Sequence, residues 1–306
     1  MPGATYGGKA PADAESQATA TQLQKDVRTL SERIGTRNIV NYKALNQAAD
    51  YIRQRLVSLG YTVNKQSFQT GGKTVANLEV VKQKKKGSGK GDVIIVGAHY
   101  DTTAATPGAD DNGSGVAALL DLAQRLRKRE LARTVRMVFF VNEEPPYFRT
   151  KHMGSYHYAK RAADAKWKIK AMFSLETMGF YSDAPHSQKY PPPFSWLYPH
   201  RGNFIAFVGN LDSRSLTRNA VRHFREVARV PSEGVAAPSF INGIDFSDQL
   251  NFWKFDFPGV MVTDTAPFRN PNYHKLSDTY DTLDYQRLAR VCAGFVAVIS
   301  ALANED

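Results

Sequence analysis

Residues 92–101 read DVIIVGAHYD, an apolar run that ends in a histidine and an aspartate. Residues 93–96 are all valine or isoleucine, without the polar alternation of a strand that has one face in water. Such a run is typical of a strand buried on both faces of a sheet. Because His99 and Asp101 stand where this strand ends, the segment predicts a buried sheet with polar residues at its edge.

Similar runs recur along the chain and alternate with segments of helical periodicity. Buried strands are predicted at 134–141, 168–175, 203–208 and 257–263, and a strand pair joined by Gly71-Gly72 at 61–70 and 74–82. Helices are predicted at 21–35, 43–59, 113–128, 153–163, 212–228 and 283–303. Strands that alternate with helices build α/β folds, so we predict a three-layer sandwich around a mostly parallel, mixed central sheet.

The pattern divides the chain into a short arm and one long folded part. Residues 1–20 are rich in Ala, Gly, Thr and Pro and lack the basic and apolar regions of a signal peptide, so we predict a flexible N-terminal arm. No linker or repeat divides residues 21–306, which are predicted to form a single domain. The chain is compatible with an exported protein, secreted or periplasmic, and with a cytosolic one.

Composition and charge exclude several classes of protein. Of 306 residues, 42% are hydrophobic and 23% charged, as in globular domains and unlike disordered or collagen-like chains. No run approaches the length of a transmembrane helix, and the single cysteine, Cys292, excludes internal disulfides and is predicted to be a buried thiol. The net charge is +11, but the basic runs at 82–90 and 125–133 contain no aromatic residues, so no specific nucleic-acid partner is predicted.

Residues that bind metals gather where the predicted strands end. In chain order they are His99, Asp101, Asp110, Asp111, Glu143, Glu144, Glu176, His274 and Asp278. In sheets of this kind, ligand sites form beyond the carboxyl ends of the strands. Imidazole nitrogens and carboxylate oxygens suit zinc or a similar divalent ion. The sequence therefore predicts a metal site at this edge of the sheet.

These segments closely resemble the family-28 metallopeptidases, the two-zinc aminopeptidase-like enzymes. The motifs are His-x-Asp at 99–101, Gly-Ala-Asp-Asp-Asn-Gly-Ser-Gly at 108–115, Asn-Glu-Glu at 142–144, Ser-Leu-Glu at 174–176, and Tyr-His at 273–274 followed by Asp278. They occur in the family's order. The resemblance implies the zinc-peptidase (phosphorylase/hydrolase-like) fold and two zinc ions per chain.

The resemblance also implies a ligand for each position of the metal site. His99 and Glu176 would hold one zinc ion, and Glu144 and His274 would hold the other. Asp111 would bridge the two ions, which its short side chain would keep close together. Glu176 stands where several family members have Asp, which lengthens the reach of this ligand slightly.

Three further residues are candidates for catalysis. The resemblance implies that Glu143 is the general base, which takes a proton from water and returns it to the leaving amine. Asp101 could set the tautomer of the His99 imidazole, and a turn cap is the alternative for this residue. Tyr273 could donate a hydrogen bond to the developing oxyanion, and a packing role at the rim of the site is the alternative.

The predicted activity is that of an aminopeptidase, which hydrolyses peptides with a free N-terminus by means of a zinc-bound hydroxide. Glutaminyl cyclase-like activity, carboxypeptidase activity and a non-catalytic, receptor-like role are the alternatives that remain open. Residues 182–202 are rich in proline and aromatic residues and follow the strand that ends at Glu176. We predict that they form part of the substrate pocket wall, through Tyr190, Phe194, Trp196 and Tyr198, and a distant surface loop is the alternative.

Overall fold

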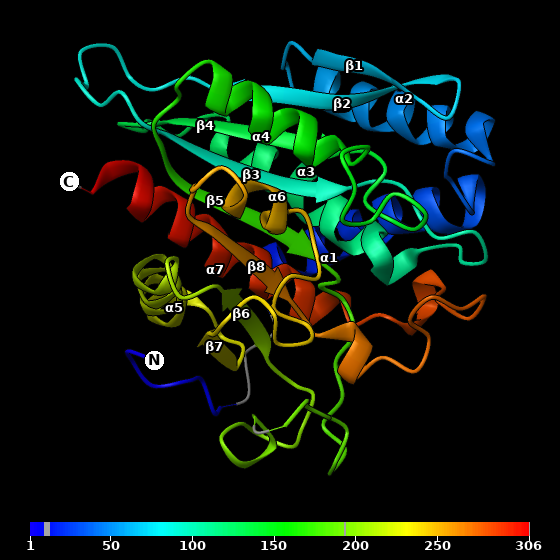
Figure 1. Cartoon of the computed structure of the whole chain (residues 1–306). Coiled ribbons are helices and arrows are strands. Elements are labelled where there is room, and N and C mark those ends of the chain that lie inside the picture. The colour runs from blue at the N-terminus through cyan, green and yellow to red at the C-terminus, as the bar shows by residue number, and fades with distance from the viewer. Residues whose placement is uncertain (9–12, 193, 306) are drawn as a thin grey trace.

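Eight strands form one mixed sheet in the computed structural model, which describes residues 1–8, 13–192 and 194–305 (Figure 1). The strands are β1 (Asn64–Thr70), β2 (Lys73–Lys82), β3 (Val93–His99), β4 (Thr134–Phe140), β5 (Ile169–Glu176), β6 (Ile205–Gly209), β7 (Ser232–Ala236) and β8 (Gly259–Thr263). Their order across the sheet is β1-β2-β4-β3-β5-β8-β6-β7. β4, β3, β5 and β8 run parallel, whereas β2 and β6 pair antiparallel with β4 and β8. The parallel strands therefore all end at one edge of the sheet.

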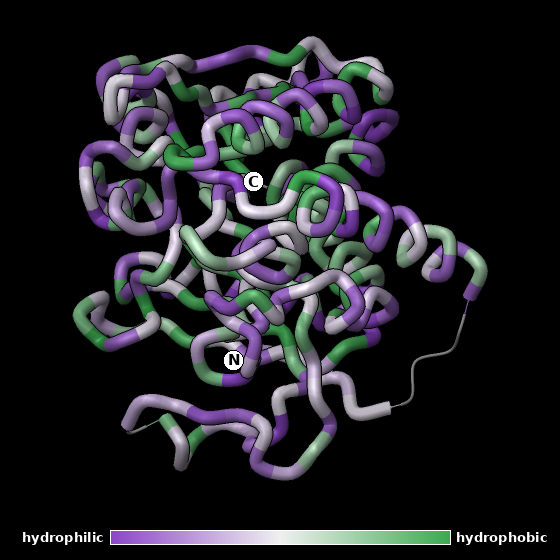
Figure 2. The backbone as a smooth tube through the Cα atoms, turned by 90° about the vertical axis from the view of Figure 1, so that its right-hand side faces the viewer, coloured by the Kyte–Doolittle hydropathy of each residue, from purple (hydrophilic) through white to green (hydrophobic). Residues whose placement is uncertain are grey.

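Helices cover both faces of the sheet, which confirms the predicted three-layer α/β sandwich (Figure 1). α4 (Gly154–Asp164) and α6 (Gln249–Trp253) pack on one face. The other face is covered by α1 (Ala14–Arg28), α2 (Tyr42–Ser58), α3 (Gly115–Leu126), α5 (Arg214–Val227) and α7 (Tyr285–Asn304). Hydrophobic and hydrophilic residues alternate along the covering helices (Figure 2), because each helix turns its apolar side toward the sheet.

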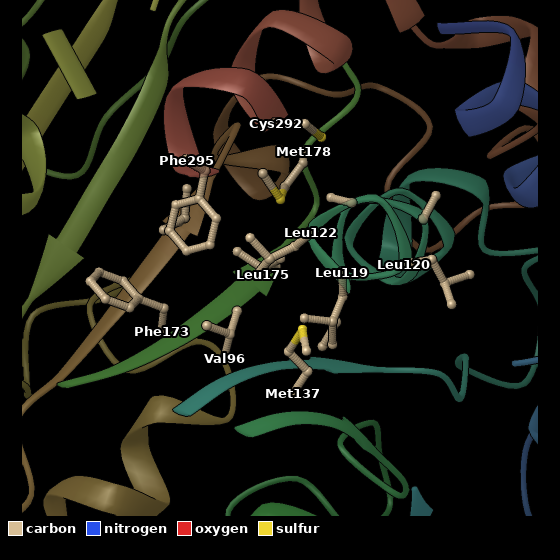
Figure 3. Close-up of a cluster of buried hydrophobic side chains, with 14 of the residues drawn as sticks. Val96, Leu119, Leu120, Leu122, Met137, Phe173, Leu175, Met178, Cys292 and Phe295 are labelled. Atoms are coloured by element: carbon tan, nitrogen blue, oxygen red, sulfur yellow. The ribbon is translucent and has the colours of Figure 1, made fainter. Parts of the chain in front are cut away.

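The larger hydrophobic core lies between the sheet and the α3 and α7 side. Figure 3 shows Val96 and Phe173 of the sheet near Leu119 of α3 and Phe295 of α7. The rings of Phe173 and Phe295 meet edge to face, with their centroids 5.3 Å apart. Cys292 is buried in this core as a free thiol, as predicted, and burial raises the pKa of the thiol.

One helix, α7, is long and apolar enough to cross a membrane by length and composition. Within the fold, 61% of its apolar window is buried. α7 packs against α1, α3 and α5. Core helices of folded domains are apolar for the same reason, so the packing of α7 accounts for its apolar composition. That the chain lacks a transmembrane segment stays a prediction.

Three elements differ from the predicted ones, and one of them is α6, whose five residues are too few to show helical periodicity. α1 begins at Ala14, inside the segment predicted as a flexible arm, because residues 14–20 are good helix formers and Asp13 caps them by accepting a hydrogen bond from the Ser16 N–H. Residues 9–12 of that arm lie outside the described residues. β7 was not predicted because Ser-Glu-Gly-Val-Ala carries no apolar alternation, and it forms by pairing with β6 at the edge of the sheet.

Candidate metal centre

The parallel strands β4, β3, β5 and β8 end at one edge of the sheet (Figure 1), and the predicted metal-binding residues meet there. His99 is the last residue of β3, Glu176 is the last residue of β5, and residues 143–144 follow β4. Asp111 lies in the turn that leads from β3 into α3, and His274 lies in the loop that follows β8. These residues are therefore placed by four strands, β3, β4, β5 and β8, and they converge because the strands are parallel.

Asp111 lies between the two histidines. Its Oδ1 is 3.3 Å from Nε2 of His99, and its Oδ2 is 3.0 Å from Nε2 of His274. Glu176 Oε2 lies 3.3 Å from the His99 nitrogen, and Glu144 Oε2 lies 3.5 Å from the His274 nitrogen. Within each group the ligand atoms lie within 4.8 Å of one another. The structure thus brings all five predicted ligands into two neighbouring groups that share Asp111.

Several atoms of these groups have no hydrogen-bond partner in the part of the chain that the structure describes. They are Nε2 of His99, Oδ1 of Asp111, Oε1 of Glu144 and Nε2 of His274, and all four are buried. Buried polar atoms without partners are rare in proteins because their desolvation is not compensated. A divalent cation would coordinate nitrogen and oxygen atoms at once, so these residues fit bound metal ions.

The charges of the site depend on one another. Burial, together with the nearby carboxylate of Asp111, raises the pKa of Glu144 to about 8. Burial also raises the pKa of Glu143 well above its ordinary value, although His99 opposes this shift. Burial disfavours the charged form of His99, but Glu176 and Glu143 outweigh it and hold the pKa of this histidine well above its ordinary value. So many carboxylates in one buried space favour the binding of positive charge.

Asp101 is placed to orient the two glutamates that follow β4. Its carboxylate accepts hydrogen bonds of 3.1 Å from the backbone N–H groups of Glu143 and Glu144. Its main-chain carbonyl oxygen lies 3.2 Å from Nδ1 of His99, whereas the carboxylate Oδ1 lies 3.6 Å from that nitrogen. The backbone carbonyl of Asp101 thus makes the contact with the His99 ring at hydrogen-bond distance. The Asp101 side chain holds the turn that carries Glu143 and Glu144.

The loop that carries Asp111 is held from two sides. Asp278 accepts hydrogen bonds from the backbone N–H groups of Asp110 (2.9 Å) and Asp111 (3.2 Å). Asn112 donates to the Leu175 carbonyl at the end of β5. Gly108 has a φ of +64°, and a Cβ there would lie 2.4 Å from the carbonyl oxygen of Asp111. The aspartates of this loop therefore need both a glycine and a distant carboxylate for their placement.

Two polar residues of the site were missed by the sequence analysis. Ser247 donates a hydrogen bond of 2.6 Å to Oε2 of Glu176. Asp248 is completely buried, both of its carboxylate oxygens lack a hydrogen-bond partner in the described residues, and burial raises its pKa to about 7. Both precede the short helix α6, and a Ser-Asp pair before an apolar segment resembles an ordinary helix cap. Only the folded chain places this pair beside β5.

An open cavity adjoins the metal-binding residues and is lined by Glu176 and Tyr273. The Tyr273 ring stacks on the ring of His274, with centroids 3.8 Å apart. This tyrosine therefore lies at the boundary between the cavity and the metal-binding residues. The loop at 182–202 contributes Tyr190, Phe194 and Tyr198 to the cavity wall, as predicted. Trp196 is not among the lining residues and is 87% exposed, so its predicted place in the wall was wrong. It lies on the outside of a turn whose inner side is occupied by Phe194.

Comparison of the sequence with known proteins gives one family. The profile of Peptidase family M28 matches residues 79–299. The chain is 40% identical to the Uncharacterized protein YfbL of Escherichia coli (strain K12), over 92% of this chain and 88% of that protein. It is 26% identical to the Probable lipoprotein aminopeptidase LpqL of Mycobacterium tuberculosis, over 81% of this chain but 51% of that protein. The chain thus spans about half the length of this relative.

Solved structures show the same fold. A zinc aminopeptidase from Bacillus subtilis, BSAP, superposes with a TM-score of 0.73 over 94% of this chain and 95% of that chain, at 15% identity. The glutaminyl cyclase of Fimbriiglobus ruber superposes with a TM-score of 0.67 over 98% of this chain and 99% of that chain, at 19% identity. At these identities the similarity extends to the fold and does not distinguish one activity from another.

Proposed function

The chain belongs to peptidase family M28 and is a peptide hydrolase, and from this premise we propose that it is a zinc-dependent aminopeptidase that removes N-terminal residues from peptides. The observation that carries the proposal is the position of Asp111, which presents one carboxylate oxygen to each of two histidines. A shared carboxylate between two ligand groups is what a two-metal hydrolytic site requires.

We assign five residues as zinc ligands. His99 and Glu176 would hold one ion, Glu144 and His274 would hold the other, and Asp111 would contribute to both. The unpartnered buried atoms of four of these residues support the assignment. Zinc, when bound, lowers the pKa of water and polarises a carbonyl group, which is the chemistry that peptide hydrolysis needs.

Glu143 is assigned as the general base. Its Oε2 lies 3.9 Å from Nε2 of His99, so its carboxylate is close to the proposed ligands without belonging to the shared pair around Asp111. Asp101 fixes the backbone of Glu143, and the side chain is 7% exposed at the border of the site. Burial raises the pKa of Glu143, so the carboxylate is basic enough to accept a proton from water and return it to the leaving amine.

Tyr273 and the surrounding carboxylates are assigned to substrate binding. The Tyr273 side chain lines the cavity beside Glu176, where its hydroxyl could donate to the oxygen of the peptide bond under attack. The free amine of a peptide is positively charged, and the acidic residues of the site would attract it. This preference for a free amine favours an aminopeptidase over a carboxypeptidase, which would need a cation for the substrate carboxylate.

The test combines metal analysis with a panel of substrates. We expect about two zinc ions per chain by elemental analysis, hydrolysis of aminoacyl p-nitroanilides, loss of activity with 1,10-phenanthroline, and its return on addition of zinc. An N-acetylated substrate is the matched control and should not be cleaved. Full activity in metal-free protein would overturn the proposal. Conversion of N-terminal glutamine to pyroglutamate without hydrolysis of any peptide would show a glutaminyl cyclase instead.

A further inference from the structure

The cavity beside the metal centre extends along a single row of residues across the sheet. Glu176 of β5 pairs with Thr263 of β8, Thr263 pairs with Ala206 of β6, and Ala206 pairs with Glu233 of β7. All four residues line the cavity. The cavity therefore begins at a proposed zinc ligand and ends at a second glutamate in the same row.

The length of this row suits a long side chain. Three strand spacings separate β5 from β7, and at about 4.8 Å for each spacing the two glutamate backbones lie about 14 Å apart. Thr263 and Ala206, which form the floor between them, have short side chains, so the space above the floor is open. An extended side chain that starts near the metal centre would point along this floor toward Glu233.

The walls of the cavity are mostly apolar. Aromatic side chains line it from the loop after β5, from the segment before β6 and from the loop after β8. They include Tyr190, Phe194, Tyr198, Phe204 and Phe268. Among the described residues that line the cavity, Glu176 and Glu233 are the only charged ones. Tyr198 also ties its loop to the far end by donating a hydrogen bond to the Gly234 carbonyl.

Glu233 is incompletely paired. Its side chain is 20% exposed, and in the described residues it accepts no hydrogen bond. Its one ion-pair partner there is Arg225, whose Nη2 lies 3.7 Å away and which donates hydrogen bonds to Ser232 and Gly3 instead. Burial raises the pKa of Glu233, and the positive charges of Arg225 and of the N-terminal amine only partly oppose the shift. A half-buried carboxylate in this condition gains free energy when a cation with hydrogen-bond donors comes beside it.

We propose that Glu233 is the specificity-determining residue of this cavity and selects peptides whose N-terminal residue is arginine or lysine. The inference rests on the proposed aminopeptidase function. The aliphatic part of either side chain would lie between the apolar walls, and its charged group would reach Glu233 at the far end. The aromatic rings add favourable contacts with a cation. A neutral apolar side chain would fill the walls equally well but would offer Glu233 no hydrogen-bond donor, leaving the half-buried carboxylate with Arg225 3.7 Å away.

The test uses pairs of substrates that differ in charge and little in shape. The 7-amido-4-methylcoumarin derivatives of arginine and citrulline form one pair, and those of lysine and norleucine form the other. We expect kcat/KM to be at least about tenfold higher for the charged member of each pair. A ratio of this size corresponds to the free energy of one charge-assisted hydrogen bond. Glu233→Gln should remove most of this preference while it keeps the activity toward norleucine. Glu226→Gln on the exposed face of α5 is the matched control and should leave both ratios unchanged.

The outcomes separate this inference from the proposed function. If the purified protein cleaves norleucine and citrulline substrates as fast as the charged ones, or if Glu233→Gln leaves an existing preference intact, the inference is overturned and the aminopeptidase assignment stands. If no aminoacyl substrate is cleaved by zinc-loaded protein, the proposed function fails as well. Glu233→Asp keeps the charge and should keep the preference in part, so it provides a second variant if Glu233→Gln does not fold.

Discussion

The hydroxyl of Ser247 donates a hydrogen bond of 2.6 Å to Oε2 of Glu176. The same carboxylate oxygen lies 3.3 Å from Nε2 of His99, so the serine holds the oxygen that faces the proposed metal position. Because Ser247 and Glu176 come from different parts of the chain, the orientation of this proposed ligand depends on tertiary structure. Partners of metal ligands usually contribute to metal affinity as well as to geometry.

Ser247→Ala should therefore weaken zinc binding at the site of Glu176. We expect the affinity for one of the two ions to fall by about 10- to 100-fold, the usual effect of losing such a hydrogen bond. Competition with a fluorescent zinc chelator measures it. Ser58→Ala, on the exposed end of α2, is the control and should bind zinc as the wild type does. Unchanged affinity in Ser247→Ala would mean that Glu176 is not a ligand or is held by other groups.

Glu143→Gln and Glu144→Gln should have different effects although the two residues are adjacent. Glu143→Gln removes a proton acceptor and keeps the shape, so both zinc ions should stay while kcat falls by about 10²- to 10⁴-fold. Glu144→Gln weakens a proposed ligand, so the protein should lose zinc, and added zinc should partly restore activity. Zinc content and kcat of both variants decide the assignment. Loss of zinc in Glu143→Gln with full content in Glu144→Gln would reverse the two roles.

Two aromatic residues of the 182–202 loop provide a matched pair for the substrate pocket. Phe194 lines the cavity, whereas Trp196 is 87% exposed. Phe194→Ala should change the ranking of aminoacyl substrates, by about tenfold for the most affected one, because truncation of a packed aromatic side chain removes contact area. Trp196→Ala should leave the ranking unchanged, and neither variant should lose zinc. Equal substrate profiles for Phe194→Ala and the wild type would place the substrate elsewhere.

The stability of the metal-free protein should fall as pH rises from about 5.5 to about 8.5. Burial raises the pKa of Glu144 to about 8 and of Asp248 to about 7, so the native state binds more protons than the unfolded state in this range and loses stability with rising pH. The pKa of His274 is raised to about 10 by Asp111 and Glu144 against the effect of burial, and its contribution is also lost as pH rises toward that value.

Zinc should reverse this trend, because it binds the deprotonated ligands. Thermal unfolding of the protein in chelator and in excess zinc, at several pH values, measures both effects. We expect the difference in Tm between the two conditions to grow with pH. If the metal-free protein became more stable as pH rises over the range given above, the proposed coupling among the buried carboxylates would be contradicted.

Several features could be predicted because they depend on local pattern alone. The run at 93–96 consists of β-branched apolar residues, which is typical of a buried strand, and the alternation of such runs with helical segments leads to a layered α/β fold. The ligand candidates could be predicted because parallel strands share one direction, so polar residues at their ends meet at one edge whatever the order of the strands. His99 and Glu176 are examples, since each ends a strand of the sheet.

Other features depend on contacts between segments that are distant in the sequence. The Ser-Asp pair at 247–248 resembles a helix cap, and Glu233 stands in a segment without any pattern. Neither carries a local signal of function. Phe194 and Trp196 are separated by one residue in the same turn, yet one lines the cavity and the other faces outward.

The sequence by itself thus determined the layers, the edge where the chemistry lies and the residue types gathered there, because hydrophobic periodicity and strand direction are local properties. Tertiary structure alone decided which hydroxyl holds Glu176 and which carboxylate closes the far end of the cavity. The register of β5, β8, β6 and β7 aligns Glu176 with Glu233 across the sheet. Register is set by packing of whole strands against one another, which no single segment encodes.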